Sequence, residues 1–184
     1  KRQGKDGLSK DTEALKIWNK IVDKDKILLC GKDDNFWEMG EQGPCGPCSE
    51  IHIDLRDQSE KDKVPAIDLI NKSDPLVIEL WNLVFIQYNR RANGKLEDLP
   101  KKHIDTGMGF ERLAMVLQKV KSNYDIDIFK IIIKEIEQNT GIKYGSDEKC
   151  DIAMRVISDH LRAVSFAIAD GQLPGNTGAS YVIR

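Results

Sequence analysis

Apolar and polar residues alternate over residues 49–55, which predicts a β-strand with three aliphatic side chains on one face. A longer β-prone run covers residues 76–88 and ends near a turn at Asn93 and Gly94. The segment between these two runs, residues 56–75, is rich in charge and contains two prolines. We therefore expect an exposed excursion there rather than a further strand.

Helical spacing of apolar residues predicts helices in four other places. The predicted ranges are residues 11–22 with Asp11 as N-cap, a helix that begins near Gly109, residues 126–138 with a stop at Gly141, and residues 153–169 closed by Asp170 and Gly171. Strand patterns thus come first in the chain and helical patterns follow. This order predicts an α+β fold with an antiparallel sheet. The change of pattern places a domain boundary near residues 120–125.

Composition describes an ordinary globular chain without a basic footprint. It has 184 residues, of which 40% are hydrophobic and 32% charged, and its formal net charge is −2. Long-range attraction to nucleic acid is not expected from this net charge, although a local patch is compatible with it. No apolar run approaches the roughly 20 residues that span a bilayer, so no membrane partner is expected.

The junction around residues 103–117 carries the most informative chemistry. Asp105 ends an extended segment, Gly107 and Gly109 allow the backbone close to a ligand, and Arg112 lies one turn into the following helix. A carboxylate beside an arginine and a helix N-terminus suits an amino acid next to a nucleotide. The alternative from these residues alone is an ordinary tight turn with a solvated arginine.

Asn82 interrupts an otherwise apolar strand pattern and shares a face with Leu80 and Val84. A buried amide without partners costs about 1–3 kcal/mol. Asn82 is therefore either hydrogen-bonded within the core or kept for a ligand, and the sequence leaves both possibilities open.

Cys45 and Cys48 have the spacing of a redox motif and, with His52 nearby, of a partial zinc site. A strand follows the pair instead of the helix that redox chemistry requires, and no second ligand pair is present. We therefore interpret the Gly-Pro-Cys repeat as a rigid turn that brings the backbone close to a ligand. Four cysteines without an export signal favour a reducing compartment.

Six motifs occur in an order that resembles alanyl-tRNA synthetase, a family of class II aminoacyl-tRNA synthetases. They are NFWEMG at 35–40, GPCGPCSE at 43–50, LWNLVF at 80–85, IDTGMGFER at 104–112, NYD at 123–125 and DHLR at 159–162. The resemblance runs from about residue 11 to the end, and residues 105–112 resemble class II motif 3. It implies part of a class II antiparallel sheet in residues 1–122, followed by the start of a helical tRNA-recognition domain in residues 123–184.

The resemblance also implies a reaction and a set of site residues. Alanine and ATP, with Mg²⁺, would form alanyl-adenylate, and the alanyl group would pass to the 3′ end of tRNA(Ala). The implied amino-acid site consists of Asn82, Val84, Asp105 and Gly107. The implied ATP site consists of Trp37, Leu80, Trp81, Asn82, Gly109 and Arg112. Asp105 would bind the ammonium group, Val84 would form the side-chain wall, and Arg112 would lie near the triphosphate.

Several further expectations follow from the resemblance. Asn176 aligns with an asparagine that reads the acceptor stem, although the next residues, 177–180, depart from the family pattern. Motif 1, the motif 2 arginine and the editing domain with its zinc ligands would lie outside this chain. We thus expect a cytoplasmic fragment with little activity alone and no zinc. The alternative is a non-catalytic paralogue or an RNA-binding module on the same fold.

Overall fold

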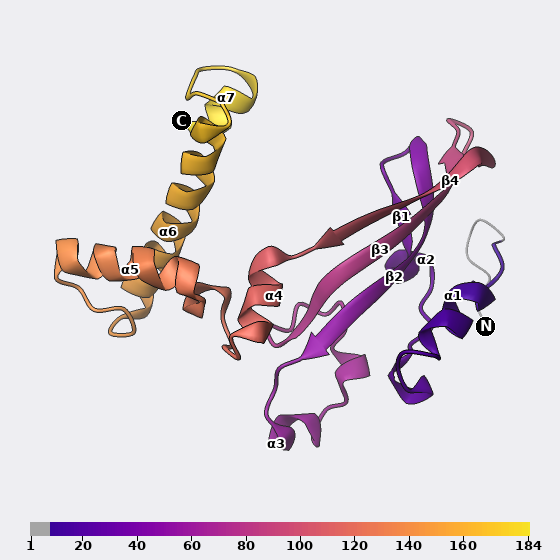
Figure 1. Cartoon of the computed structure of the whole chain (residues 1–184), viewed down its shortest axis with the longest axis horizontal. Coiled ribbons are helices and arrows are strands. Elements are labelled where there is room, and N and C mark those ends of the chain that lie inside the picture. Colours follow the sequence, from indigo (N-terminus) through magenta and orange to yellow (C-terminus); the bar gives the residue numbers. More distant parts are fainter. Residues whose placement is uncertain (1–7) are drawn as a thin grey trace. The chain divides into compact units, whose positions relative to one another are not determined.

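The computed structural model describes residues 8–184 and forms two compact units, divided between Leu113 and Ala114 (Figure 1). The first unit contains the sheet and the second is helical. The expected α+β class is therefore confirmed. The sheet part was predicted to cover residues 1–122, and its first seven residues lie outside the described range. The domain boundary near residues 120–125 stays a prediction.

The first unit is built on one sheet in the order β1-β2-β3-β4, and every neighbouring pair of strands is antiparallel. Its strands are β1 Phe36–Glu38, β2 Gly43–Asp54, β3 Val77–Arg90 and β4 Leu96–Met108. Short helices accompany them: α1 Thr12–Trp18, η1 Lys24–Lys26, α2 Lys32–Asn35, α3 Gln58–Lys61 and η2 Ala66–Asp68. The helix α4 Phe110–Leu117 follows β4 and spans the division between the units.

The hairpin between β3 and β4 confirms the predicted turn. Arg91 donates its backbone N–H to the Lys95 carbonyl at 2.9 Å, and Gly94 takes the left-handed backbone with φ of 80°. Only glycine adopts that conformation without steric cost, so this residue fixes where the chain reverses.

The prediction of a turn at the Gly-Pro-Cys repeat is wrong. Strand β2 begins at Gly43, so both Cys45 and Cys48 lie within it. The pairing with β3 is irregular between these two cysteines. At this irregularity the β2 backbone approaches β3 so closely that a Cβ on Gly46 would lie 1.9 Å from the Phe85 carbonyl oxygen. Glycine and proline, which locally indicate a turn, lie here within a strand, opposite a stretch of β3 that contains one extra residue.

A second irregularity, between Ile51 and His52, leaves Leu80 of β3 without a partner residue on β2. The Leu80 carbonyl instead accepts the backbone N–H of Gly109 at 3.0 Å. One residue earlier, the Glu79 carbonyl accepts Nη1 of Arg112 at 2.7 Å. The bulge in β3 thus fixes the start of α4, and the predicted helix start near Gly109 is confirmed.

The excursion between β2 and β3 has one buried charged residue, which the sequence did not indicate. The side chain of Arg56 is 5% exposed and donates from Nε and Nη2 to the carboxylate of Asp54, at 3.0 and 2.7 Å. This hydrogen bonding lowers the pKa of Asp54. Most other residues between 57 and 75 are exposed or half-buried, as predicted.

Helix α1 is shorter than the predicted 11–22. Asp11 caps it as expected, because its carboxylate accepts the Ala14 N–H at 2.9 Å. The helix ends at Trp18, and the chain continues in tight turns such as the bond from Lys20 N to Ile17 O. Ile21, expected on the apolar face, is 66% exposed, so no packing extends the helix.

The second unit contains η3 Asn123–Asp125, α5 Asp127–Thr140, α6 Glu148–Ala169 and α7 Gly178–Ile183. Gly141 ends α5 with φ of 72°, as predicted, and α6 begins earlier than expected because Asp147 caps it. The core of the second unit contains Ile126, Phe129, Ile133 and Met154. Among residues 8–184, no helix has the length and apolar character needed to cross a membrane.

We predict that Gly46→Ala lowers the free energy of unfolding by about 2 kcal/mol or more, because the new methyl group forces β2 away from β3. Gly40→Ala is the matched control, since its Cβ would meet only the Gln42 carbonyl at 4.0 Å. Urea unfolding of both variants measures the difference. Equal stability of the two variants would contradict the close approach at Gly46.

We predict that the Asp54–Arg56 pair makes stability depend on pH in the acid range. Because the folded protein lowers the pKa of Asp54, the pair stabilises the fold above the ordinary carboxyl value of about 4. This contribution falls as the pH drops through the lowered pKa. Asp54→Asn should be less stable than the parent at pH 7 and should lose less stability on acidification. Urea unfolding at pH 7 and pH 3 tests this, and parallel losses would contradict it.

Candidate functional site

Two rows of residues run side by side across β2, β3 and β4. In one row Asn82 lies opposite Glu50 on one side and Gly107 on the other. In the next row Val84 lies opposite Cys48 and Asp105. Directly opposed residues of antiparallel strands share a face, so both rows present their side chains on the same side of the sheet. The structure therefore brings together the four residues expected to form the amino-acid site.

The residues of these rows differ in exposure, so the surface combines a buried apolar side chain with an exposed charged one. Val84 is buried, whereas Asp105 lies exposed on β4. A Cβ on Gly107 would meet nothing within 4 Å, so the sheet surface is open at this position. A small apolar wall thus lies next to an accessible carboxylate, an arrangement that can hold a small cationic group.

The Asn82 amide is the polar centre of this face. Its Nδ2 donates to Oε1 of Glu50 at 3.2 Å. Its Oδ1 is buried and has no hydrogen-bond partner among the described residues. An unsatisfied buried acceptor costs about 1–3 kcal/mol, so this oxygen is poised to accept a donor. Of the two possibilities that the sequence left open, a fully satisfied core amide is thus not what the structure contains.

Arg112 lies beside a small polar cavity of about 190 Å³ within the first unit. Its Nη1 bonds to the Glu79 carbonyl, which holds the guanidinium at the cavity. Gly109 directly precedes α4, whose N-terminal amides carry partial positive charge. The cavity lining is His52, Asn71, Ser73, Asp74, Val77, Ile78, Glu79 and Arg112. The Arg112 guanidinium can hold an anion here, beside the Asp74 and Glu79 residues that share the cavity.

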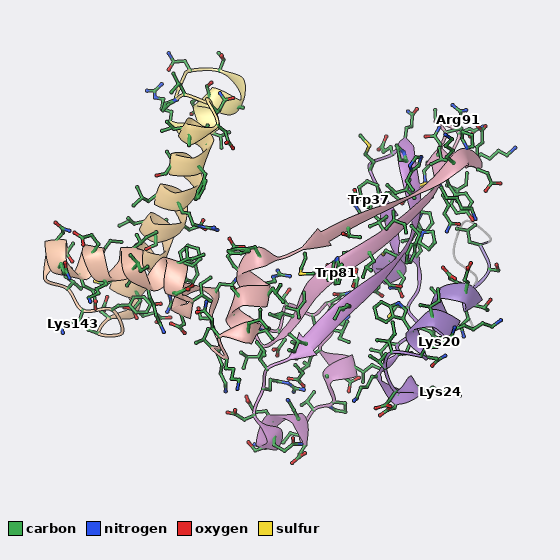
Figure 2. All side chains as sticks on the ribbon, viewed as in Figure 1. Lys20, Lys24, Trp37, Trp81, Arg91 and Lys143 are labelled. Carbon is green, nitrogen blue, oxygen red and sulfur yellow. The ribbon has the colours of Figure 1, made fainter. Side chains whose placement is uncertain are left out.

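The tryptophans expected at the nucleotide site come from separate strands (Figure 2). Trp37 lies on β1 opposite Gly46, and Trp81 lies on β3. Trp81 pairs with Ile51 and Met108, so its side chain alternates to the face opposite Asn82. The side chains of Trp81 and Asn82 therefore lie on opposite faces of the sheet. Only backbone atoms of Trp81 can contact a ligand on the Asn82 face.

Glu50 and Glu79 are site residues that the sequence did not single out, and His52 was considered there only as a zinc ligand beside the cysteines. Glu50 and His52 lie two residues apart on one face of β2, and Oε2 of Glu50 is 3.0 Å from Nε2 of His52. The alternation of residues 49–55 predicted that face, but only the register of the strands places it beside Asn82. Glu79 lies opposite His52 and shares the cavity with Arg112.

The paired cysteines do not have the properties of a redox centre. Burial, followed by the nearby carboxylates of Glu50 and Glu79, raises the pKa of the Cys48 thiol to about 12. A thiol with this pKa is protonated near neutral pH and is a poor nucleophile. Within residues 8–184 no group of three His, Cys, Asp or Glu side chains is arranged to hold a metal ion.

Asn176 belongs to the second unit and lies in the exposed loop before α7. Its Oδ1 accepts a hydrogen bond from Nη1 of Arg184. The loop is closed by a bond from the Gly175 N–H to the Ser180 carbonyl at 2.9 Å. Asn176 is thus an exposed residue on a loop that a backbone hydrogen bond closes.

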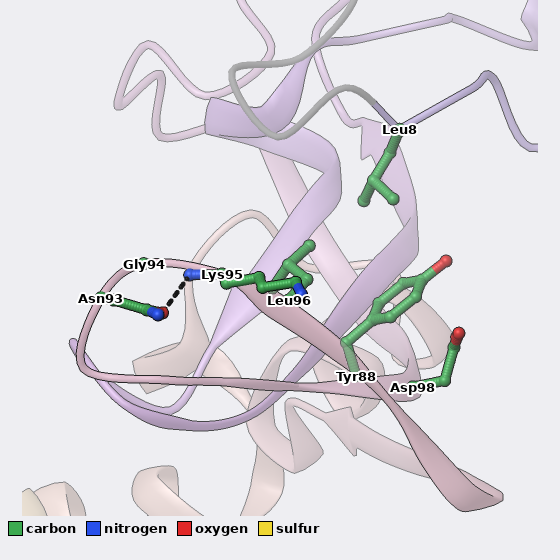
Figure 3. A pocket seen from close by; sticks show the side chains of 7 residues that line it. All are labelled: Leu8, Tyr88, Asn93, Gly94, Lys95, Leu96 and Asp98. Atoms are coloured by element: carbon green, nitrogen blue, oxygen red, sulfur yellow. Dashed lines mark hydrogen bonds between the residues drawn. The ribbon is translucent and has the colours of Figure 1, made fainter.

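A larger cavity of about 510 Å³ lies at the β3–β4 turn, at the end of the hairpin away from Gly109 (Figure 3). None of the residues expected at the amino-acid or ATP site lines it. Its lining consists of Leu8, Tyr88, Asn93, Gly94, Lys95, Leu96 and Asp98. The larger cavity and the expected chemistry therefore lie at different ends of the sheet.

Comparison with known proteins identifies close relatives. The chain is 65% identical over 180 residues to an alanine–tRNA ligase of Christiangramia forsetii, covering 98% of this chain and 21% of the relative. It is 62% identical over 180 residues to an alanine–tRNA ligase of Cytophaga hutchinsonii, with 98% and 20% covered. For an alanine–tRNA ligase of Bacteroides thetaiotaomicron the values are 59% over 179 residues, with 97% and 20% covered.

The chain thus spans about one fifth of the length of these relatives. The family model described as tRNA synthetases class II (A) matches residues 4–184, which is nearly the whole chain. The motifs quoted above, the antiparallel sheet and this match agree with one another. The chain belongs to the tRNA synthetases class II (A) family.

Proposed function

We propose that this chain is the part of an alanine–tRNA ligase that supplies the alanine-binding face and one phosphate-binding group of the aminoacylation site. The names of its relatives and their identity of 59–65% support this function. The observation that carries the proposal is the pair of cross-strand rows, in which Asp105, Val84, Asn82 and Gly107 are immediate neighbours.

The two rows match the chemistry of alanine. The exposed Asp105 carboxylate attracts the ammonium group, and the unpartnered Oδ1 of Asn82 accepts one of its hydrogens. Buried Val84, which lies in the same row as Asp105, offers a wall against which a methyl group packs. The open backbone at Gly107 admits the ligand without a side chain in the way. The four residues thus suit the ammonium group, the methyl group and the small size of alanine.

The same surface continues to an anion-binding end. Arg112 and the N-terminus of α4 at Gly109 neutralise phosphate charge, and ATP would bring Mg²⁺ with it as substrate. The alanine carboxylate then attacks the α-phosphate of ATP and pyrophosphate leaves. No covalent enzyme intermediate is required, so the protein acts by positioning and charge stabilisation. In the second step a hydroxyl of the 3′-terminal ribose of tRNA(Ala) attacks the alanyl carbonyl, the alanyl group is transferred to that hydroxyl, and AMP leaves.

Recognition of tRNA(Ala) falls to the second unit in this proposal, with Asn176 reading a base edge of the acceptor stem. An amide both donates and accepts, which suits a base edge. The loop bond between Gly175 and Ser180 supports a fixed presentation of Asn176. The proposed setting is the cytoplasm, where alanine, ATP and tRNA occur together.

A non-catalytic paralogue that binds RNA is the second candidate function. Such a protein has no use for an exposed carboxylate and a phosphate-binding arginine on one sheet end, yet Asp105 and Arg112 are both retained. Alanine-dependent chemistry therefore separates the two candidates.

We predict alanine-dependent ATP–pyrophosphate exchange by a chimera in which this chain replaces its 180-residue match in the Christiangramia forsetii relative. The isolated chain should show little exchange. Asp105→Asn in the chimera should reduce exchange at low alanine by about 100-fold, because it removes the charge opposite the ammonium group. A folded chimera that gives no alanine-dependent exchange, beside an active parent relative, would refute the proposed function.

We also predict that the chimera activates serine. A site built around the wall of Val84 cannot strongly reject an amino acid that adds one hydroxyl, because such a difference is worth only ~1–3 kcal/mol. Serine-dependent exchange should thus fall within about 10–200-fold of alanine-dependent exchange in kcat/KM. A preference for alanine of about 10⁴ or more would contradict the permissive pocket.

A further inference from the structure

Glu50 is half-buried beside the proposed alanine site, and both of its oxygens are engaged. Its side chain is 13% exposed. Oε1 accepts Nδ2 of Asn82 at 3.2 Å, and Oε2 lies 3.0 Å from Nε2 of His52. A carboxylate only accepts, so Nε2 of His52 carries the proton in this contact. The carboxylate is thus held between two donors on neighbouring positions of the sheet.

This contact fixes the direction of the Asn82 amide. An amide has a donating and an accepting end, and only the donating nitrogen can face a carboxylate. Rotating the amide by half a turn would place Oδ1 against Oε1 of Glu50, two acceptors at hydrogen-bond distance. Glu50 therefore keeps Oδ1 turned away from itself, where it is buried and has no partner among the described residues.

We propose that Glu50 is a positioning residue of the alanine site, which holds the Asn82 amide so that its oxygen is offered to the ammonium group of the amino acid. This inference rests on the proposed function. Glu50 acts through Asn82 and does not touch the substrate. The ammonium group then meets the Asn82 oxygen from one row and the Asp105 carboxylate from the next.

His52 completes the arrangement on the other side of Glu50. It lines the cavity beside Arg112, and its side chain is 12% exposed. By donating to Oε2 it prevents the Glu50 carboxylate from rotating away from Asn82. The chain of contacts from Asn82 through Glu50 to His52 therefore joins the amino-acid rows to the phosphate-side cavity.

An exchange of donor and acceptor between positions 50 and 82 tests this role. Asn82→Asp alone sets two carboxylates against each other. The double variant Glu50→Gln/Asn82→Asp restores one donor and one acceptor with their roles exchanged, keeps the parent's net charge, and still offers an oxygen to the ligand. Both variants are made in the chimera described above and assayed by ATP–pyrophosphate exchange.

We predict that Asn82→Asp raises KM for alanine about tenfold or more, equivalent to about 1.4 kcal/mol, and that this rise exceeds any rise in KM for ATP. The double variant should return KM for alanine to within about threefold of the parent. Glu50→Asp, which keeps the charge but withdraws it by one methylene, should raise KM for alanine several-fold. If circular dichroism shows that Asn82→Asp unfolds at a lower temperature than the parent chimera, Glu50→Asp is the variant that tests the role of Glu50.

The matched control is Glu97→Gln, which removes an exposed carboxylate paired with Arg91 at the hairpin and should leave both KM values unchanged. A double variant no better than Asn82→Asp, or equal rises in KM for alanine and ATP, would overturn the role of Glu50. If the parent chimera shows no alanine-dependent exchange, the proposed function fails and the inference fails with it. If the parent is active and the variants keep its KM for alanine, only the role of Glu50 fails.

Discussion

The pairing register of β3 is the constraint on which the candidate site depends. This strand pairs with β2 on one side and β4 on the other, and its register decides which side chains meet. A slip of one residue would turn Asn82 and Val84 to the other face, away from Asp105 and Glu50. The register is held by irregularities, because Gly46 lets β2 approach Phe85 and the extra residue Leu80 gives its carbonyl to Gly109. The bulges thus set both the rows of side chains and the start of α4.

Sequence patterns predicted the elements whose causes are local. Alternation gave the face of β2, the Asn93–Gly94 pair gave the hairpin turn, and Asp11 and Gly141 marked helix ends, because each signal acts through a residue's own backbone or its near neighbours. The strand at Cys45 and Cys48 was missed because pairing with β3 overrides the turn preference of glycine and proline. The buried Arg56 and the early end of α1 also depend on packing that periodicity does not contain.

The candidate site divides in the same way. Asp105 and Arg112 could be singled out from the sequence, since a strand-to-helix junction gathers its charges within a few residues of one another. Asn82 drew attention as a polar residue in an apolar strand, but its orientation depends on Glu50, which is 32 positions away in the chain. No local pattern relates Glu50 to Asn82. The family resemblance placed both Trp81 and Asn82 at the ATP site, whereas alternation along β3 puts their side chains on opposite faces of the sheet.

Under the proposed function, the site must offer a negative charge to the ammonium group and a positive charge to the phosphates. These two protein charges must not be used up in contacts within the protein, so other groups have to hold the site in place. Glu50 is half-buried and contacts Asn82 and His52, so its charge orients a neutral amide, whereas Asp105 is exposed and its charge is available to the ligand. Arg112 is fixed by a backbone carbonyl, not by a carboxylate, so its positive charge is not cancelled by that bond. The Glu50 carboxylate and the Glu79 backbone carbonyl therefore do the positioning, which leaves the charges of Asp105 and Arg112 for the two ends of the substrate.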